Sequence, residues 1–564
     1  MTPERGWRQA IVAGLVWGLS AVFVSLVGLV EAVQQRQIIT GVIAGGHAML
    51  LLMAVGAGVQ AANRLAARGA SRVLLGAALA GAIAGTLVAL LILLSTIVNM
   101  RPILVGATPT LFAVLSLGLG VTALPWVVII GIVAASSGAA LTLLPPTVRR
   151  LTVTGAATVL LVGLFQELVQ LMLQSERIAR VRDLFFTIDG LPPRGALIVL
   201  AIAVGISAVW GQQRPKVRRR MADLAPGQRR VVQTVGLVTG VVLVLLMPLL
   251  AGPFLSQVLV LVGLYTLMGL GLNLEVGFAG LLDLGFAAFF AIGAFTVGLL
   301  TTTGPLAIAN FSWWTATLIA VVVSLISGVF FGLPVLGIRG DYLAIATLGF
   351  GEIIRLMVLS DFLRPWLGGS QGVLAIPKPV LFGYELRGPE QLFYLTLGAS
   401  AIIAFVAARL RDSRLGRAWM ALREDEDVAQ AMGINLINVK LLAYAIGAAF
   451  AGVGGAIFAV MVSSVFPHSF TVLLSINVLA LIIVGGMGSL PGVVVGSLAL
   501  VGLPELLREF SDFRFLVYGA VLMLMMIMRP EGLWPAAAQR RELHEEVERV
   551  PEGEMVTKVE EAGT

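Results

Sequence analysis

Three polar residues interrupt an apolar, glycine-rich stretch and could form a site inside a membrane. Asn273, Glu275 and Asp283 lie within LGLNLEVGFAGLLDLGFAAFFAIGAF, residues 270–295. Polar side chains are costly in hydrocarbon, and they usually face the interior of a helix bundle or a water-filled cavity. We therefore expect these residues to line a path across the membrane. A second interpretation stays open, above all for Glu275, in which a polar residue lies at the membrane interface or caps a broken helix.

Glu352 and Arg355 are three residues apart, so on a helix they share one face and can neutralise each other. This spacing favours a structural ion pair over a substrate contact. Both residues remain candidates for the translocation path.

A dense run of charge separates two segments that are each apolar enough to span a bilayer. Residues 411–440 read RDSRLGRAWMALREDEDVAQAMGINLINVK. Such a loop cannot lie in hydrocarbon, so we expect it in water beside the membrane. Its Ala, Leu, Met and Glu content predicts a short helix that ends at Gly433, a residue able to adopt positive φ.

The centre of this loop holds five consecutive charged residues: Arg423, Glu424, Asp425, Glu426 and Asp427. Mixed charge without apolar cover suits a polar interface with a partner that moves. We expect these residues and Gly433 to form a mechanical coupling element. A solvated surface with no partner is the simpler alternative.

No catalytic or metal-binding set is recognisable in the sequence. A Walker A phosphate loop needs Gly-Lys followed by Ser or Thr, and none of the four lysines follows a glycine. Ser370 lies in a G-x-S-x-G match, but the match falls in a loop after a membrane segment rather than in a strand-to-helix turn. His47, His468 and His544 are too scattered for a metal cluster. We expect no enzyme activity, no metal and no cofactor.

Composition identifies the elements that must position these residues. The chain of 564 residues is 58% hydrophobic and only 12% charged, and its mean hydropathy is +0.98. Continuous apolar runs of about 20 residues recur, the length that crosses a bilayer as a helix. We expect an all-α, polytopic transmembrane bundle in the inner or plasma membrane. Arginine at the ends of the segments explains the basic balance through topology and does not indicate nucleic-acid binding.

The sequence divides into four parts. Residues 1–210 form an N-terminal transmembrane extension for which no role emerges. Residues 211–230 form a basic cytoplasmic linker with seven basic residues against one acid. Residues 231–535 form the main transmembrane domain, which contains the 411–440 loop. Residues 536–564 form a charged cytoplasmic tail that cannot bury a core.

Span counting favours six helices before the linker: 10–30, 38–62, 71–98, 103–120, 125–144 and 151–173. If the run 196–210 does not cross, the amino terminus is cytoplasmic, and the count by itself leaves this parity open. The run 196–210 is short for a crossing. Ten further apolar segments follow the linker, and the last of them lies near 514–529.

Several motifs follow one another in a fixed order within residues 254–535. After the 270–295 stretch come IRGDYLAIATLGFGEIIRL (338–356), IPKPVLFG (376–383), GRAWMALREDEDVAQAMGI (416–434), FAGVGGAIFA (450–459), VFPHSF (465–470), IVGGMGS (483–489) and MRPEGLWP (528–535). With these motifs the chain resembles the LivM-type permease of branched-chain amino acid ABC importers. The 411–440 loop resembles the EAA loop of ABC importer permeases, with Asp427-Val428-Ala429 in place of Glu-Ala-Ala. The chain departs from the family at Glu275, where an apolar residue is usual, and at Pro467-His468.

The resemblance implies a function and a set of partners. Such a permease provides half of a substrate pathway and pairs with a second homologous permease subunit. Two ABC ATPase subunits drive it, and an extracytoplasmic solute-binding protein delivers the ligand. We therefore expect an ATP-driven importer of leucine, isoleucine, valine or a related amino acid, with ATP hydrolysed on separate subunits that push on the 411–440 loop.

Three alternatives remain open at this point. Sister permeases of similar sequence carry urea or short-chain amides, so such a substrate is the nearest alternative. An ion-coupled secondary transporter could use Glu275, Asp283, Glu352 and Arg355 as an ion relay. A membrane-embedded enzyme built on Ser370 is the weakest of the three.

Overall fold

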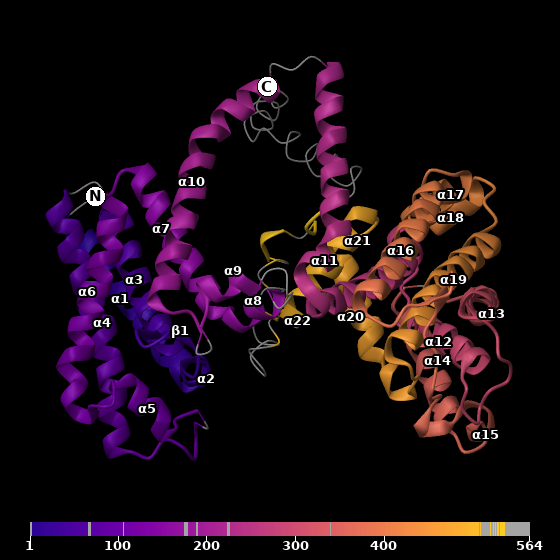
Figure 1. Ribbon diagram of the computed structural model, residues 1–564, viewed down its shortest axis with the longest axis horizontal. Coiled ribbons are helices and arrows are strands. Elements are labelled where there is room, and N and C mark those ends of the chain that lie inside the picture. Colours follow the sequence, from indigo (N-terminus) through magenta and orange to yellow (C-terminus); the bar gives the residue numbers. More distant parts are fainter. Residues whose placement is uncertain are drawn as a thin grey trace, which may run out of the picture. The chain divides into compact units, whose positions relative to one another are not determined.

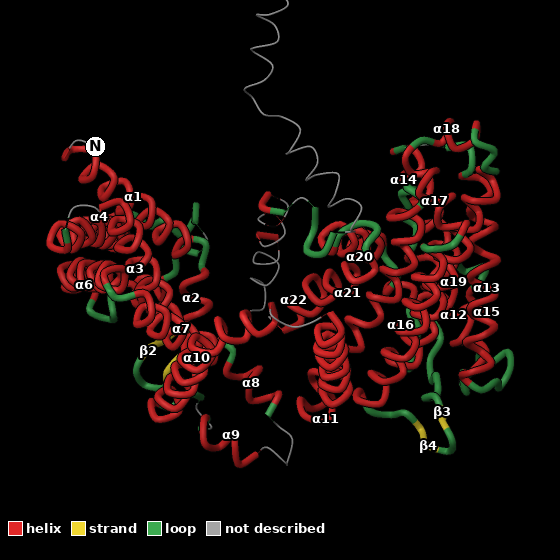
Figure 2. The backbone as a smooth tube through the Cα atoms, turned by 90° about the horizontal axis from the view of Figure 1, so that it is seen from above, coloured by secondary structure: helices red, strands yellow, loops and turns green. Residues whose placement is uncertain are grey.

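The computed structural model describes residues 3–65, 69–104, 106–173, 179–187, 190–222, 226–338, 340–506, 508, 519–520, 523, 525, 527–529 and 531–535. Helices make up almost all of this part of the chain, beside two short antiparallel strand pairs (Figure 2). Twelve of the described helical segments are long and apolar enough to cross a membrane. The expected all-α, polytopic fold is confirmed. The charged tail 536–564 and most of the expected span near 514–529 lie outside the described residues.

The chain forms two compact units, Met1–Leu243 and Val244–Thr564. Their boundary falls inside a helix, α11 (Pro226–Leu272), rather than in the basic segment 211–230. Of that segment, residues 211–222 continue the preceding helix and residues 226–230 begin α11.

The first unit contains ten helices before α11 and one strand pair among its described residues: α1 (Pro3–Leu26), α2 (Leu29–Gln34), β1 (Gln37–Ile39), β2 (Ile43–Ala44), α3 (Gly45–Leu65), α4 (Ala70–Ile97), α5 (Pro109–Leu115), α6 (Leu124–Leu143), α7 (Pro146–Leu164), α8 (Gln166–Met172), α9 (Ala179–Phe185) and α10 (Pro193–Ala222). Helix α4 packs against α1, α3 and α6, and α7 packs against α10. Close approach depends on glycine, because a Cβ on Gly58 of α3 would lie 1.8 Å from the Ala135 carbonyl oxygen of α6.

One expected span in this unit is wrong, and one segment that was judged too short to cross is long enough to do so. Residues 103–120 do not form one helix, because Leu117, Gly118 and Gly120 adopt positive φ and end α5 after seven residues. Together α5 and α6 provide a single candidate span, Pro109–Leu143. The run 196–210 lies in α10, whose Pro193–Gly211 stretch is long and apolar enough to cross.

The second unit continues from α11 with these elements: a π-helical segment, η3 (Asn273–Phe278), then α12 (Ala287–Thr301), α13 (Trp313–Val335), α14 (Asp341–Leu359), α15 (Arg364–Leu367), η4 (Gly369–Gln371), β3 (Val380–Leu381), β4 (Tyr384–Glu385), α16 (Pro389–Arg411), α17 (Arg414–Glu424), α18 (Glu426–Ala431), α19 (Leu436–Val462), η5 (Pro467–Ser469), α20 (Val472–Gly485), α21 (Leu490–Ser497), a second π-helical segment, η6 (Leu498–Gly502), and α22 (Leu503–Leu506). Helix α11 breaks at Gly252, which has a non-helical φ of 76° and is followed by Pro253.

Helix α19 lies at the centre of this unit and packs along both α12 and α13. Glycines bring its backbone against theirs: a Cβ on Gly455 would lie 2.1 Å from the Phe290 carbonyl oxygen, and one on Gly328 would lie 2.5 Å from the Tyr444 carbonyl oxygen. Lipid tails are as apolar as leucine, so such helices are held by close packing rather than by a hydrophobic drive. Figure 1 shows α17 and α18 at one end of this bundle and α15 at the other.

Replacing Gly455 by alanine tests this packing. The added methyl group meets a backbone oxygen that cannot move aside alone, so we expect Gly455→Ala to lower the free energy of unfolding by about 1–3 kcal/mol. Thermal unfolding in detergent micelles measures the change. Gly398→Ala on α16 is the control, because its Cβ would meet no atom within 4 Å. Equal stability of the two variants would contradict the packing argument.

Candidate functional site

The polar candidates from the sequence gather where α11 ends. Its last turn widens into the π-helical segment Asn273–Phe278, and Leu281 N–H donates to the Glu275 carbonyl at 2.8 Å. Gly280 then turns the chain with a φ of 72°. Single π-helical turns inside α-helices occur frequently at functional sites.

Asn273 joins this turn to the segment between α20 and α21. Its side chain is fully buried, and its Oδ1 accepts a hydrogen bond of 2.9 Å from Gly488 N–H. A Cβ on Gly277 would lie 2.2 Å from the same Oδ1. The contact therefore depends on glycine at position 277, and the Nδ2 of Asn273 has no hydrogen-bond partner among the described residues.

Glu275 is fully buried beside helix α19. A Cβ on Gly447 of that helix would lie 2.0 Å from Glu275 Oε1. Neither carboxylate oxygen has a hydrogen-bond partner within the described structure, and the hydroxyl of Tyr444, one turn earlier on α19, has none either. Burying a carboxyl group without a hydrogen-bond donor is expensive, so this arrangement lowers the stability of the closed bundle.

Asp283 lies near Glu275 in the irregular segment that leads to α12, and it is 1% exposed. Its Oδ1 accepts a hydrogen bond of 2.7 Å from Gly285 N–H. The neighbouring Leu284 N–H donates to the Thr347 hydroxyl of α14 at 3.0 Å. The structure thus brings Asn273, Glu275 and Asp283 together, held by α14, α19 and the turn before α21.

A cavity of about 20 Å³ adjoins this polar cluster, and its wall includes Asp283, Thr347 and Tyr444. That volume accommodates one water molecule and is far too small for an amino acid. The cluster therefore lies in a closed part of the bundle in this conformation.

Glu352 and Arg355 form the expected ion pair on one face of α14. Arg355 Nε donates to Glu352 Oε2 at 2.9 Å, and a second contact joins the same two side chains. Both side chains are partly exposed. Within the described structure these two side chains bond to each other, and Glu275 and Asp283 are the fully buried carboxyl groups.

The charged loop forms two helices, where the sequence predicted one that ends at Gly433. Asp425 has an extended φ of −158°, and its side chain accepts hydrogen bonds from Asp427 N–H and Val428 N–H at 2.8 and 3.0 Å. Aspartate is a strong N-cap, so it ends α17 and starts α18. Gly433, with a φ of 86°, then turns the chain toward α19.

Two buried anchors fix this pair of helices to α19. The fully buried Trp419 of α17 donates from Nε1 to the Val439 carbonyl at 2.9 Å. Glu426 of α18 forms a salt bridge of 2.7 Å with Lys440, whose side chain is 5% exposed. Glu426 is thus directed inward, while Glu424 and Asp427 are exposed.

Arg423 connects the loop with the polar cluster. Its Nη1 donates a hydrogen bond of 2.7 Å to the Gly277 carbonyl, which belongs to the same π-helical turn as Asn273 and Glu275. The close fit continues at Gly280, where a Cβ would lie 3.0 Å from Arg423 Cγ. Arg423 is thus a direct contact between α17 and the turn that holds Glu275.

Charged groups outside the membrane segments tie down both ends of the bundle. In the loop, the hydrogen bond from Arg411 holds the pKa of the Asp412 carboxyl below its ordinary value. Near the end of α19, Lys378 Nζ donates to the carbonyls of Val460 and Met461, and burial lowers the pKa of this ammonium group. Cations that bond the last carbonyls of a helix stabilise its C-terminus.

Sequence reasoning missed several members of this arrangement: Gly277, Trp419, Tyr444, Gly447 and Gly488. Their contacts use backbone atoms or glycine clearance, which leave little signal in one sequence. Val428 and Met432 of the α18 region were also missed. They are 59% and 80% exposed and four residues apart, so they form an apolar patch among the charges.

Ser370 lies in η4, a single turn that follows α15. No strand precedes it there, so the context of a nucleophile elbow is missing at this position.

Comparison with known proteins identifies the family. The sequence profile described as "Branched-chain amino acid transport system / permease component" matches residues 254–528. The high-affinity branched-chain amino acid transport system permease protein LivM of Salmonella typhimurium is 41% identical over 295 residues, which cover 48% of this chain and 68% of that protein. LivM of Escherichia coli is 39% identical over 328 residues, which cover 54% of this chain and 76% of the relative.

The permease protein LivH of Escherichia coli is more distant, with 27% identity over 194 residues that cover 32% of this chain and 62% of LivH. No solved structure matches. The match begins near Gly252, where α11 breaks, and it contains the polar cluster and the loop with α17 and α18. The chain is therefore a multi-pass membrane protein that belongs to the permease family of branched-chain amino acid transport systems.

Proposed function

We propose that this chain is the permease subunit of an ATP-driven importer for branched-chain amino acids. The names of the LivM and LivH relatives support the substrate class. None of the relatives named above is described as a transporter of urea or amides. Following the family, the chain pairs with a second permease, binds two ATPase subunits and receives ligand from a solute-binding protein.

The contact between Arg423 and Gly277 carries the mechanism. ATPase subunits that close on ATP move α17 and α18, which project from the end of α19 (Figure 1). Arg423 transmits this movement to the π-helical turn, while Trp419 and Lys440 transmit it to α19. Packed bundles respond to such a push by switching between two arrangements. Asn273, Glu275 and Asp283 lie at the point where the two routes meet.

The desolvation cost of the buried Glu275 side chain favours a switch to the open arrangement. Its carboxyl group is buried beside that of Asp283, and neither oxygen accepts a hydrogen bond from a backbone N–H or a basic side chain among the described residues. A movement of the π-helical turn that brings water or the substrate ammonium group to this carboxylate removes the desolvation cost. The open pathway is thereby stabilised relative to the closed bundle.

The apolar patch of Val428 and Met432 is the proposed contact with the ATPase. Exposed apolar side chains among charges are typical of a docking surface. Glu424 and Asp427 surround the patch and suit the polar rim of such an interface.

Reconstitution of the complex tests the function itself. Liposomes that contain this chain, its partner permease, both ATPase subunits and ATP should accumulate leucine when the binding protein is added. This chain alone should not, because it has no nucleotide-binding motif in its sequence. Accumulation by the chain alone, driven by an ion gradient, would overturn the proposal.

Removing the Arg423 side chain should uncouple transport from ATP hydrolysis. We expect Arg423→Met to reduce leucine uptake about tenfold while ATPase activity and complex assembly persist, a coupling loss of the usual size. Arg423→Lys should restore part of the uptake, because lysine keeps a donor.

Arg417→Met on the same helix is the matched control, since among the described residues Arg417 donates to the Asp412 carbonyl, which lies within the loop itself. Equal uptake by the Arg417 and Arg423 variants would show that the contact with Gly277 does not transmit movement.

A charge placed in the apolar patch should weaken ATPase docking. Val428→Asp desolvates a carboxylate in the interface, so we expect it to lower ATPase recovery in co-purification by about tenfold or more. Tyr384→Asp, in strand β4 at a position that is 80% exposed and lies outside the candidate membrane spans, serves as the control for a new charge elsewhere. Retention of the ATPase by Val428→Asp would exclude the patch as the contact.

A further inference from the structure

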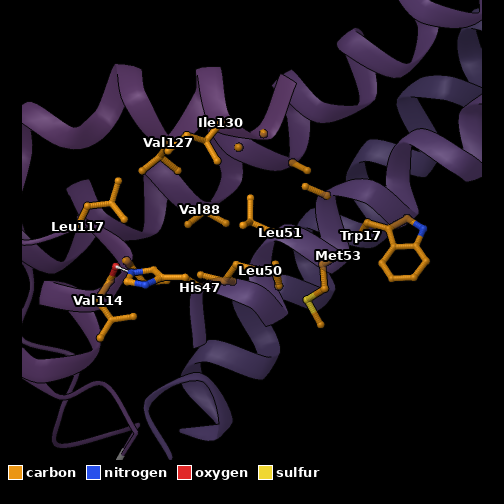
Figure 3. A pocket seen from close by; sticks show the side chains of 16 residues that line it. Trp17, His47, Leu50, Leu51, Met53, Val88, Val114, Leu117, Val127 and Ile130 are labelled. Carbon is orange, nitrogen blue, oxygen red and sulfur yellow. Dashed lines mark hydrogen bonds between the residues drawn. The ribbon is translucent and has the colours of Figure 1, made fainter. Parts of the chain in front are cut away.

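The N-terminal unit contains an apolar cavity that has no place in the proposed transport mechanism. The cavity has a volume of about 150 Å³, and helices α1, α3, α4, α5 and α6 form its wall. Figure 3 shows Leu50, Leu51, Val88, Val127 and Ile130 around the space, with Trp17 and His47 at separate places on the wall.

Small residues create this space. Ala21, Ala54, Ala84, Gly85 and Gly131 contribute to the wall, at points where larger side chains would fill the gap between helices. Gly85 also allows close contact on its other side, because a Cβ there would lie 2.9 Å from Val128 Cα. The helices are thus close enough to form a stable wall and leave a volume between them.

The polar groups of the wall are already satisfied within the protein. The Gln34 amide nitrogen can only donate, so His47 Nδ1 accepts from it at 3.3 Å. His47 Nε2 therefore carries the hydrogen and donates to the Val114 carbonyl at 3.2 Å (Figure 3). Trp17 Nε1 donates to Gln60 Oε1 at 2.7 Å. Neither ring needs a hydrogen bond from a ligand, which points to a ligand without polar groups in the cavity.

The helices around the cavity are candidate membrane spans, so lipid tails surround them. At its rim, Leu117 and Ile130 are 42% and 36% exposed. An apolar cavity of this volume excludes water and takes up an apolar molecule. An empty cavity also deprives its wall of dispersion contacts, so a chain that fills it stabilises the unit.

We propose that this cavity binds a segment of one acyl chain of a membrane phospholipid, since its volume holds a few methylene groups and the rest of the chain stays in the bilayer. The chain enters from the bilayer past Leu117 and Ile130. His47 lies in the first turn of α3, whereas Trp17 and Met53 lie farther into their helices. The headgroup end of the lipid is therefore next to His47, and the methyl end of the chain is next to Trp17 and Met53.

Filling the cavity tests the site independently of transport. We expect full-length protein, purified in mild detergent, to retain a phospholipid that native mass spectrometry detects. Ala54→Phe should lose this lipid, because the ring occupies the cavity. Leu52→Phe should keep it, because Leu52 is 51% exposed and does not line the cavity. Equal retention by both variants would overturn the proposal.

A measurement on the unaltered chain tests the site even if the Ala54→Phe variant misfolds. A phospholipid with a photoreactive diazirine in its acyl chain is exchanged into the protein, and excess lipid is removed before illumination. We expect crosslinks to Met53 and to neighbouring lining residues of α3 and α6. Crosslinks confined to exposed residues outside the cavity, or occupancy by detergent with no stabilisation on adding phospholipid, would overturn the assignment. Because no transport is measured, failure here leaves the proposed permease function intact.

Discussion

Close contact between helix backbones is the constraint on which the second unit depends. In a bilayer, helices gain little from leaving lipid, so they associate through dispersion and close fit. Helix α19 meets that condition with glycines at the points where α12 and α13 pass. A glycine contact also shapes the site, because the missing side chain of Gly447 leaves the room in which Glu275 lies against α19. Packing and function therefore use the same surface of one helix.

This arrangement explains how a loop outside the membrane can affect a buried carboxyl group. Trp419 and Lys440 hold the loop to the start of α19, and Lys378 bonds carbonyls near its end. In the proposed mechanism α19 moves as a rigid body between these anchors, while the π-helical turn follows Arg423. In this proposal the loop acts on the bundle by two routes, through Arg423 on the π-helical turn and through Trp419 and Lys440 on α19. The buried carboxyl group of Glu275 favours the arrangement in which the pathway is open.

The sequence predicted the fold class well because hydrocarbon permits few alternatives. Long continuous apolar runs can satisfy their backbone only as helices, which is why α4 and α6 lie close to their expected ranges, 71–98 and 125–144. Span counting was wrong where local backbone geometry decided the outcome, as with positive φ after α5. The run 196–210 was also misjudged, because α10 extends on both sides of it.

The polar candidates show a similar division. Asn273, Glu275 and Asp283 were recognisable because polar residues in an apolar stretch are rare, and the structure brings them together. Their partners were not recognisable, since Gly277 contributes a carbonyl and Gly447 contributes only space. The break at Asp425 was missed because the helix propensities of its neighbours outweighed a capping contact that is visible only in three dimensions.

That break separates two tasks that a continuous helix would have combined. Trp419 secures α17 to the membrane bundle, whereas the exposed side chains of α18 begin after an independent cap. A substitution at an exposed position of α18, such as Val428, therefore leaves the Trp419 contact and the Glu426–Lys440 salt bridge in place. In the proposed mechanism, the contact surface for an ATPase subunit could thus change in sequence while the membrane bundle stays the same.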